Sequence, residues 1–554
     1  MAFNLALPMR PSIAGLGSLK KSETTIFGAS RRVPSLRNEN KSLRLTIRCW
    51  KGSVPPTSVT DKTTSTDQTE ETNPANQITR KDFATDFKFG CSTSALQTEG
   101  KGDEGGRGPS TWDRNIQDST GITDVAVDSY NRYKDDVQVL VDMGADTYRF
   151  SISWSRILPD GTVDGGINQE GINFYNNLIN ELIKNGITPF VTLFHFDLPQ
   201  ALGDKYNGFW SSQIVDDFKA YANVCFQYFG DRVKHWITIN EPQIWAPYGY
   251  KIDATNALQN AATDPFLCAH HIILAHATAV QLYRDTYQSV QAGQIGISLV
   301  TEWFLPASDT IQDQDAAQRA FDFLVGWFLE PLVFGDYPFI MKALVRDGLP
   351  EFTDDEKTLI KGSFEFIGVN YYTSRYATAV AFDKDATFST YSDYQFATVS
   401  GISNPSFLFV AFVTVKNKVG DDIGPPTPGS SEIYIYPKGL TDALVYMLNA
   451  YNKPKFFVTE NGYPELRDDT IPVETALQDD ARIQHILQHL YAISEAIKQG
   501  ADVNGYFMWA LMDCMEVGSS YKVRFGLAYT DYLNNLERIL KKSAKWFKDV
   551  FLAS

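Results

Sequence analysis

From Ile78 onward, short apolar runs alternate with amphipathic stretches in which apolar positions recur at helical spacing. Eight of the apolar runs have the length and pattern of buried strands. These predicted strands lie at residues 87–90, 147–150, 188–194, 233–240, 294–299, 366–370, 455–460 and 503–510. The amphipathic stretches predict helices, for example at residues 130–143, 170–185, 213–229, 268–286 and 479–499.

No boundary rich in Pro, Gly or Ser divides this part of the chain, so residues 80–554 are predicted to form one domain. Eight strands, each followed by a helix or a long insertion, predict an α/β fold, a single (β/α)8 TIM barrel with enlarged loops. In that fold the strands end on one rim, and polar residues at those ends are the default catalytic candidates.

The first 49 residues differ in composition from the rest of the chain. They carry nine Lys and Arg residues against Glu23 and Glu39, with interspersed serines and no continuous apolar core. This composition predicts an organelle transit peptide, for the plastid, cleaved near Cys49. The alternative is a disordered basic tail. Residues 50–79 are rich in Thr, Ser and Pro and poor in large apolar residues, and are predicted to be a flexible linker.

The bulk composition narrows the range of partners and cofactors. A net charge of −16 and a pI near 5.0 argue against nucleic acid and anionic membrane surfaces. The longest strongly apolar run, Phe407 to Val413, is far shorter than the ~20 residues of a membrane-spanning helix. Five scattered cysteines lack the spacing of a zinc site or a disulfide framework, so we expect them to be reduced. We also expect no metal and no cofactor, because the sequence contains neither a metal-ligand cluster nor a Gly-rich phosphate loop.

Candidate chemistry lies at the ends of the predicted strands. Glu241 stands in the segment TINEP and Glu460 in VTENG, each at the end of a strand. Two carboxylates presented from one rim are what glycoside hydrolysis needs. A lone glutamate at a strand end is usually a surface carboxylate, but two in these contexts favour a functional pair. Other polar residues at strand ends are His195, Asp197, Asn240, Tyr371 and Tyr372.

From about Asp82 to Leu552 the chain resembles glycoside hydrolase family 1, the family of the plant β-glucosidases. The segments that carry the resemblance occur in order along nearly the whole domain. They are FKFGCSTSALQTEG, GRGPSTWD, YRFSISWSRILP, FHFDLPQAL, TINEP, GVNYYTS, VTENGY and VRFGLAYTDY.

The resemblance implies a retaining mechanism with Glu460 as the nucleophile and Glu241 as the general acid/base. In such a mechanism the carboxyl groups lie ~5 Å apart, and burial and the neighbouring charge raise the pKa of the acid. The resemblance also implies that Asn240 binds the sugar 2-hydroxyl, that Tyr372 orients the nucleophile and that Arg149 neutralises it. Positions that match the family's sugar-binding residues are Gln97, His195, Glu516 and the aromatic floor Trp509. Each of these could instead be a structural polar or core residue.

The chain departs from the family pattern in the segment WALMDCMEVG, residues 509–518. Val517 stands where relatives have a second tryptophan, which contacts the outer hydroxyls of the sugar. The change removes an aromatic wall and an N–H donor, which implies a looser pocket or one that admits a decorated sugar. Asn131, Leu96 and Phe196 replace a usual His, Tyr and Trp.

The leaving-group side of the site is expected to be apolar. Candidate aromatic residues in the insertions are Trp245, Trp303, Phe304, Phe407 and Phe409. If they line the mouth, the aglycone is bulky and hydrophobic, such as a steroidal saponin, a terpenoid or a phenolic; the alternative is that they only pack. The plastid peptide and the CMEVG variant are similar to features of the β-glucosidases that activate furostanol saponins.

Several functions stay open at the level of sequence. Glu241 distinguishes the chain from the myrosinases, which carry Gln at that position. A transglycosidase or a disaccharide-specific β-glycosidase would use the same residues. An inactive sugar-binding or storage protein is the alternative from a different class. The expected partner is a small-molecule glycoside, and the resemblance allows a homo-oligomer, because large plant relatives often assemble.

Overall fold

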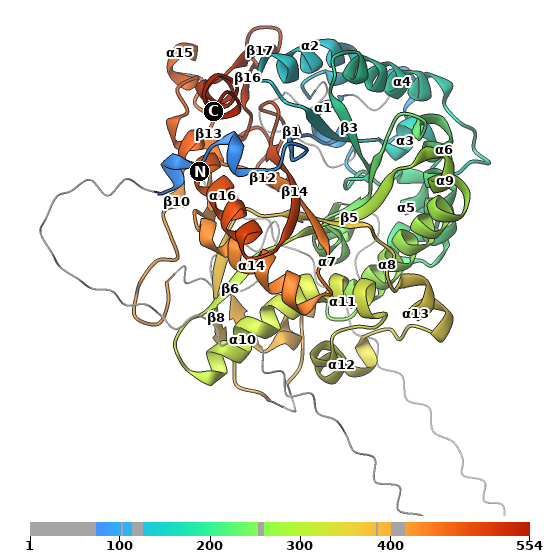
Figure 1. Ribbon diagram of the computed structural model, residues 1–554. Coiled ribbons are helices and arrows are strands. Elements are labelled where there is room, and N and C mark those ends of the chain that lie inside the picture. The colour runs from blue at the N-terminus through green and yellow to red at the C-terminus, as the bar shows by residue number, and fades with distance from the viewer. Residues whose placement is uncertain (1–73, 101–103, 114–125, 253–259, 384–385, 400–415) are drawn as a thin grey trace, which may run out of the picture. The chain divides into compact units, whose positions relative to one another are not determined.

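The computed structural model describes residues 74–100, 104–113, 126–252, 260–383, 386–399 and 416–554. Eight parallel strands close into a barrel in the order β1-β14-β12-β7-β5-β4-β3-β2 (Figure 1). Their bounds are β1 Lys88–Ser92, β2 Thr147–Ser151, β3 Thr188–Phe194, β4 His235–Asn240, β5 Gln294–Val300, β7 Phe366–Asn370, β12 Lys455–Asn461 and β14 Asp502–Trp509. These are the eight predicted strands, so the predicted α/β fold, a (β/α)8 barrel with enlarged loops, is confirmed.

The five helices predicted as examples are also present. They are α2 Ser129–Asp142, α4 Gln169–Lys184, α6 Gln213–Phe229, α8 Asp264–Leu282 and α16 Asp480–Lys498. In α4 the buried residues Ile172, Tyr175, Ile179 and Leu182 recur every three or four positions, and the side chain of Asn168 caps the first turn. Helix α8 begins four residues earlier than predicted, because Pro265 fits the first turn of a helix, where its missing N–H has no partner to lose.

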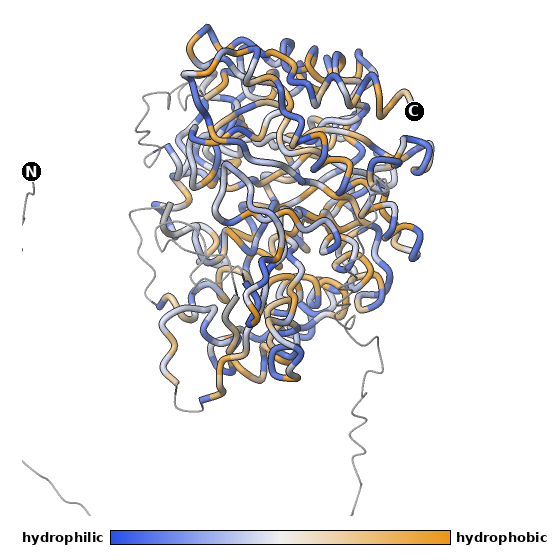
Figure 2. The backbone as a smooth tube through the Cα atoms, turned by 90° about the vertical axis from the view of Figure 1, so that its left-hand side faces the viewer, coloured by the Kyte–Doolittle hydropathy of each residue, from blue (hydrophilic) through white to orange (hydrophobic). Residues whose placement is uncertain are grey.

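The other α-helices of the described residues are no longer than α2. They are α1 Ala95–Thr98, α3 Trp154–Ile157, α5 Gln200–Tyr206, α7 Pro242–Ile252, α9 Gln288–Gln291, α10 Ile311–Phe321, α11 Trp327–Phe334, α12 Phe339–Val345, α13 Asp354–Ile360, α14 Pro437–Ala450, α15 Val473–Ala476 and α17 Lys542–Trp546. Hydrophobic and hydrophilic residues alternate along much of the described chain, as expected when the helices bury one face against the barrel (Figure 2).

The barrel interior below the rim is filled by aromatic and aliphatic side chains. Phe190, Ile237, Phe366, Phe457 and Phe507 form a separate buried cluster. Phe190 packs edge-to-face against three of the other phenylalanines, with ring centroids 5.1–5.4 Å apart. This packed plug makes the barrel a solid support, so that ligands have access only to its rim.

Small sheets that the sequence did not predict occupy the loops after the barrel strands. One sheet joins β6 Trp303–Pro306, β8 Ser374–Ala379 and β9 Ala397–Val399. The others pair β10 Pro426–Thr427 with β11 Ser430–Tyr434, β13 Glu465–Leu466 with β15 Val523–Arg524, and β16 Ala528–Asp531 with β17 Glu537–Leu540. Each of these strands belongs to a loop that follows β5, β7, β12 or β14 in the sequence, so together they build up the carboxyl rim.

The described part of the chain begins inside the predicted linker. Pro74–Gln77 form a 3-10 helix, and both Ala75 and Ile78 are buried, so these residues pack with the domain. The predicted transit peptide, the first part of the linker, Phe407 and Phe409 lie outside the described residues. The four cysteines within the described residues are all buried and free.

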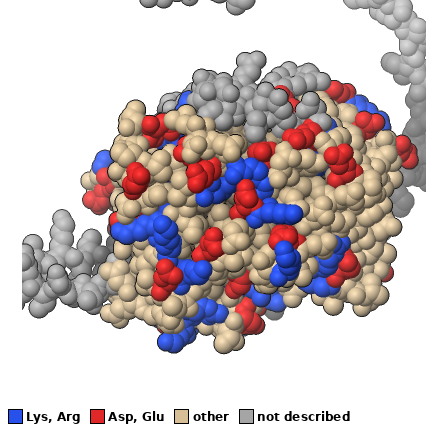
Figure 3. Space-filling model, turned by 90° about the horizontal axis from the view of Figure 1, so that it is seen from above, with Lys and Arg blue, Asp and Glu red and all other residues tan. Residues whose placement is uncertain are grey.

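One continuous helical stretch among the described residues, Asp264–Gln291, is long and apolar enough to cross a membrane. Its apolar window is 72% buried inside the protein, as expected for a core helix, and a bent pair at 311–334 and 339–348 passes the same test. Basic and acidic side chains are interspersed over the face that Figure 3 shows.

Candidate active site

Glu241 and Glu460 face one cavity at the carboxyl rim of the barrel. Glu241 directly follows β4, with a left-handed backbone (φ 44°), and Glu460 is the second-last residue of β12. Both line a cavity of about 430 Å³, together with Gln97, His195, Tyr372, Trp509 and Glu516. Arg149 and Asn240, the other two predicted site residues, are fully buried and bonded to this group from β2 and β4. The structure therefore brings all nine sequence-predicted residues together.

The Glu460 carboxylate is held by two charged or polar donors. Arg149 donates from Nη1 to Oε1 at 2.6 Å, and the Tyr372 hydroxyl donates to Oε2 at 2.9 Å. Arg149 is 0% exposed and Glu460 is 4% exposed, so this ion pair is shielded from water. The two donors fix both oxygens of the carboxylate and favour its charged form.

Glu241 is linked to the same network through Asn370, at the end of β7. Asn370 donates from Nδ2 to Glu241 Oε1 at 2.8 Å and lies 3.1 Å from Asn240 Oδ1. Asn240 Oδ1 also accepts from Arg149 Nη2 at 2.5 Å, and Asn240 Nδ2 lies 3.2 Å from His195 Nε2. The sequence interpretation did not include Asn370 as a site residue, although its place at a strand end was the signal that could have identified it.

The charges and hydrogen bonds that act on the two glutamates differ. Burial and the charge of Glu460 raise the pKa of Glu241, and the hydrogen bond from Asn370 and the charge of Arg149 only partly oppose this. Burial also raises the pKa of Glu460, but Arg149 acts on it through both its charge and a direct hydrogen bond, and Tyr372 adds a second bond. Of the two, Glu460 has the more direct cationic partner. A single shared proton is therefore held on Glu241.

A second group of polar residues gathers around Glu516. Trp509 donates from Nε1 to Glu516 Oε1 at 3.2 Å, and Gln97 Nε2 lies 3.4 Å from Glu516 Oε2. The Trp509 ring stacks on His195, with centroids 5.7 Å apart. Burial raises the pKa of Glu516 to about 8, opposed by the bond from Trp509. An indole face next to amide, imidazole and carboxyl groups suits a pyranose, which has apolar faces and a polar edge.

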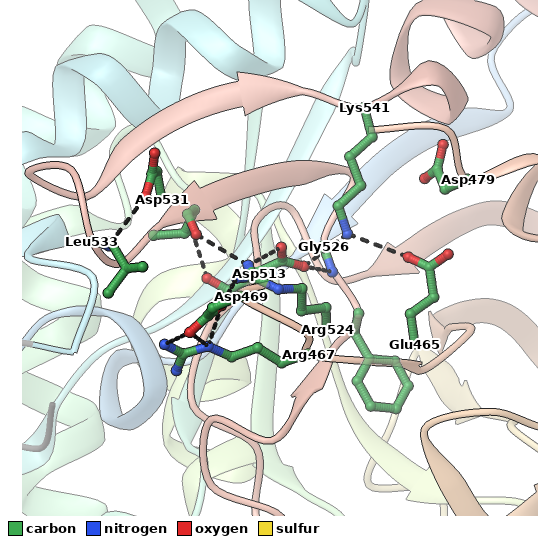
Figure 4. Close-up of polar contacts among 12 residues, drawn as sticks. Glu465, Arg467, Asp469, Asp479, Asp513, Arg524, Gly526, Asp531, Leu533 and Lys541 are labelled. Carbon is green, nitrogen blue, oxygen red and sulfur yellow. Dashed lines mark hydrogen bonds and ion pairs between the residues drawn. The ribbon is translucent and has the colours of Figure 1, made fainter. Parts of the chain in front are cut away.

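The segment that carries Glu516 is anchored by a buried ion network. Asp513 accepts from Arg524 Nη1 at 2.8 Å and from Lys541 Nζ at 2.9 Å (Figure 4). The backbone N–H of Gly526 donates to the same carboxylate at 2.9 Å, and a Cβ at Gly526 would lie 2.0 Å from Asp513 N. Only glycine allows this close approach. Asp513, Arg524 and Lys541 are buried and lie outside the set predicted from the sequence.

Of the aromatic residues expected at the mouth, the three that the structure describes, Trp245, Trp303 and Phe304, do not line the cavity. Trp245 is 1% exposed and stacks parallel to Phe196, Phe304 is buried, and Trp303 packs against Phe321 and Tyr446. The expectation is therefore wrong for these three residues, because each is used in packing β6, α7 or α10. The apolar part of the cavity wall comes instead from Phe196, Ile244, Val300, Ile433, Val517, Val523 and Phe525.

The other departures from the family pattern differ in their distance from the cavity. Asn131 is exposed and donates to Glu104 and Asp128 at 2.8 Å, and Leu96 is buried. Val517 and Phe196 line the cavity. The loss of a tryptophan at 517 therefore changes the cavity wall itself.

Comparisons with known proteins agree with this geometry. The model of the family "Glycosyl hydrolase family 1" matches residues 79–553. The chain is similar to Beta-glucosidase 12 of Oryza sativa subsp. indica, with 45% identity over 86% of this chain and 93% of that protein. It is also similar to the furostanol glycoside 26-O-beta-glucosidase of Hellenia speciosa, with 43% identity over 99% of both chains.

Among solved structures, a mutant of a rice β-glucosidase in a covalent complex with Glc has a TM-score of 0.79 and 41% identity. The match covers 86% of this chain and 99% of that one. The chain therefore belongs to glycosyl hydrolase family 1 and is a glycoside hydrolase of the retaining, double-displacement type.

Proposed function

We propose that this protein is a β-glucosidase in which Glu460 is the nucleophile and Glu241 is the general acid/base. The observation that carries the proposal is that the two carboxyl groups have different hydrogen-bond partners. Glu460 accepts from a buried arginine at 2.6 Å, whereas Glu241 accepts, among the described residues, from the neutral amide of Asn370. One carboxylate stays charged and the other holds a proton, as a retaining glycosidase requires.

The reaction follows from these two protonation states. Glu460 attacks the anomeric carbon and forms an ester bond, while the glycosidic C–O bond breaks and Glu241 gives its proton to the departing oxygen. Glu241 is now a carboxylate and takes a proton from water. That water attacks the anomeric carbon, and Glu460 leaves as a carboxylate. Glucose is released with its β configuration, and both glutamates return to their starting states.

The polar groups around the carboxyls have roles in binding the sugar. Asn240 is fixed by Arg149 and can present its amide to the 2-hydroxyl, next to the reacting carbon. Gln97, His195 and Glu516 bind the other hydroxyls, and the Trp509 ring supports the apolar face of the pyranose. Tyr372 positions Glu460 through its hydroxyl.

The aglycone is proposed to be bulky, as in a steroidal, terpenoid or phenolic glucoside. Support comes from the apolar wall that includes Ile244, Val300 and Phe525, and from the similarity to a furostanol glycoside glucosidase over nearly the full length of both chains. A disaccharide-specific glycosidase and a transglycosidase would use the same pair of glutamates. Transfer of the sugar to an added alcohol identifies a transglycosidase, and release of a disaccharide in place of glucose identifies a disaccharide-specific glycosidase.

The first experiment uses the full chain with p-nitrophenyl β-glucoside. We expect the native protein to release glucose and Glu460→Gln to lose at least a thousandfold in kcat. The control variant Glu351→Gln, which changes an exposed residue, should keep the native activity. No release by a folded native protein would contradict the proposal and favour a sugar-binding protein.

Azide separates the two roles. In Glu460→Gly, azide occupies the space left by the nucleophile and attacks the anomeric carbon from its α face. The product is therefore the α-glucosyl azide. In Glu241→Gly, azide attacks the glucosyl-enzyme, so the product is the β-glucosyl azide. The reverse assignment of products would show that the roles are exchanged.

We further propose that the chain acts in the plastid, directed by residues 1–49. The proposal rests on the basic, serine-rich composition of this segment. The match to the furostanol glycoside glucosidase also extends over it, since it covers 99% of this chain.

A further inference from the structure

Two buried hydroxyl side chains lie next to the catalytic glutamates, and none of the proposed catalytic steps uses them. Thr459, on β12, immediately precedes Glu460 in the sequence. Ser298, on β5, accepts the backbone N–H of Glu241 through its carbonyl oxygen at 2.8 Å. Both side chains are 0% exposed. A buried hydroxyl is costly unless it is hydrogen-bonded, so the partners of these two groups show what they do in the site.

The two hydroxyls meet where strand β7 has no side chain. Ser298 Oγ donates to Thr459 Oγ1 at 3.1 Å. A Cβ at Gly368 would lie 2.2 Å from Ser298 Oγ and 2.8 Å from Thr459 Oγ1, so only glycine leaves room for this contact. Residues two apart on a strand face the same side of the sheet. Asn370 therefore faces the same side of β7 as the pair of hydroxyls.

Arg149 determines which way the neighbouring amides point. An arginine only donates, and its Nη2 lies 2.5 Å from Asn240, so the amide atom at that place is the acceptor Oδ1. Asn240 Oδ1 and Glu241 Oε1 are thus both acceptors, and Asn370 Nδ2 donates to them at 3.1 and 2.8 Å. Asn370 Oδ1 points the other way, where it accepts from Thr459 Oγ1 at 2.6 Å.

The hydrogen bonds consequently run in one direction, from the two hydroxyls through Asn370 to Glu241. A hydroxyl has one hydrogen, and that of Thr459 is used on Asn370. Since Asn370 donates to Glu241 Oε1, an acid proton on the same oxygen would face an N–H group. The proton of Glu241 is therefore held on Oε2, and Oε2 is the atom that gives the proton to the leaving group.

We propose that Thr459 is a positioning residue for proton transfer: its hydroxyl fixes the amide of Asn370, and this amide keeps the acid proton of Glu241 on Oε2. The inference rests on the proposed function, in which Glu241 is the general acid. Without the hydroxyl, Asn370 Oδ1 loses the donor that holds it, and the amide is free to turn this oxygen towards the acid proton. Protonation of the leaving group then becomes slower, while the carboxylate of Glu460 keeps both of its own donors.

The pH profile gives an independent sign. The charged and titratable groups that face Glu241 are Glu460 on β12, Arg149 on β2, Glu302 after β5 and Tyr372 after β7. None of them is changed in a Thr459 variant. The hydrogen bond from Asn370 lowers the pKa of Glu241, so a weaker bond should raise this pKa and move the alkaline limb of kcat/KM to higher pH.

The test compares a leaving group that needs the acid proton with one that does not. Phenolate is basic and must be protonated as it departs, whereas 2,4-dinitrophenolate leaves without a proton. We would divide kcat/KM for phenyl β-glucoside by kcat/KM for 2,4-dinitrophenyl β-glucoside. The variants are Thr459→Val, which keeps the shape without the hydroxyl, and Thr459→Ser, which keeps the hydroxyl. Thr475→Val, at an exposed position, is the control.

In Thr459→Val we expect this ratio to fall roughly tenfold, the effect of one hydrogen bond, together with the shift of the alkaline limb. Thr459→Ser and Thr475→Val should keep the native ratio. An equal loss with both glucosides, or a loss that Thr459→Ser does not restore, would limit Thr459 to packing and overturn the inference. An unchanged ratio would overturn it as well. If Thr459→Val does not fold, Thr459→Ala decides in its place.

Glu241→Gln separates this inference from the proposed function on which it rests. In this variant kcat/KM should fall steeply for phenyl β-glucoside and stay near its native value for 2,4-dinitrophenyl β-glucoside. An equal loss with both substrates would show that Glu241 is not the general acid, and the proposed function would then fail whatever Thr459 does.

Discussion

Glu241 and Glu460 carry the same functional group, and their neighbours make them different. Arg149 and Tyr372 bind both oxygens of Glu460, while Glu241 meets one neutral amide and the repulsion of Glu460. Both glutamates are in a low-dielectric site, where such differences have a large effect on protonation. Their different chemistry is therefore set by the side chains that surround them.

Tyr372 offers a direct check of this argument. In Tyr372→Phe, Glu460 loses the bond at 2.9 Å, and kcat/KM should fall roughly tenfold to a hundredfold, the effect of one hydrogen bond to a charged group. Because that bond lowers the pKa of Glu460, the acid limb of the pH profile should also move to higher pH. Tyr491→Phe on the outer helix α16 is the matched control. An acid limb that stays in place would show that Tyr372 does not act on Glu460.

The alkaline limb of the pH profile of kcat/KM should depend on the pKa of Glu241. Activity requires its proton, so kcat/KM falls as pH rises through its pKa. The charged groups that act on it are Glu460 on β12, Arg149 on β2 and Glu302 after β5. Since Glu302 raises the pKa of Glu241, Glu302→Gln should move the alkaline limb to lower pH. A limb that does not move, or moves to higher pH, would contradict this electrostatic coupling.

At the scale of elements, the loop after β14 depends on a buried ion network. It carries Glu516 and Val517 into the site, and Asp513 joins it to Arg524 and Lys541 (Figure 4). Burial alone would raise the pKa of Asp513, but the two cations lower it, so the carboxylate is charged. The ion network therefore determines where the sugar-binding carboxyl lies.

Asp513→Asn tests the anchor. Among the described residues, removing the charge leaves Lys541 with Glu465, at 3.6 Å, as its ion-pair partner, and we expect a loss of about 3–5 kcal/mol in the free energy of unfolding. Urea unfolding measures it, and KM for p-nitrophenyl β-glucoside should rise because Glu516 is displaced. Asp549→Asn, at an exposed position, should change neither quantity. Lower stability with an unchanged KM would limit Asp513 to a structural role.

The barrel strands could be predicted from the sequence, whereas the loop sheets could not. A strand such as Thr188–Phe194 is buried on both faces and reads as a continuous apolar run. The β6-β8-β9 sheet joins residues up to about a hundred positions apart, and its β6 edge is partly exposed, so no local pattern marks it. The same reason explains why Glu241 and Glu460 were predicted from local motifs, while Asn370, Glu302 and Asp513 required tertiary contacts. Trp245, Trp303 and Phe304 were assigned to the mouth because composition alone does not tell a lining residue from a packed one.

At the scale of the whole molecule, the chain combines an acidic catalytic domain with a basic N-terminal segment. The net charge is −16, yet residues 1–49 contain nine basic and two acidic residues. The described residues bury a core that extends from Ala75 to Phe551. A basic segment joined to an acidic domain is suited to a role in targeting.

Import into isolated chloroplasts tests this role. The full chain should be taken up, protected from added protease and shortened, with a new N-terminus near Cys49, whereas a chain that begins at residue 50 should stay outside. Replacing Arg31, Arg32 and Arg37 by Ala should reduce uptake, because the cationic character of the segment is lost. The matched control replaces Lys542, Lys545 and Lys548, three exposed basic residues of the domain, and should be imported normally. Uptake by the shortened chain, or none by the full chain, would exclude residues 1–49 as a plastid signal.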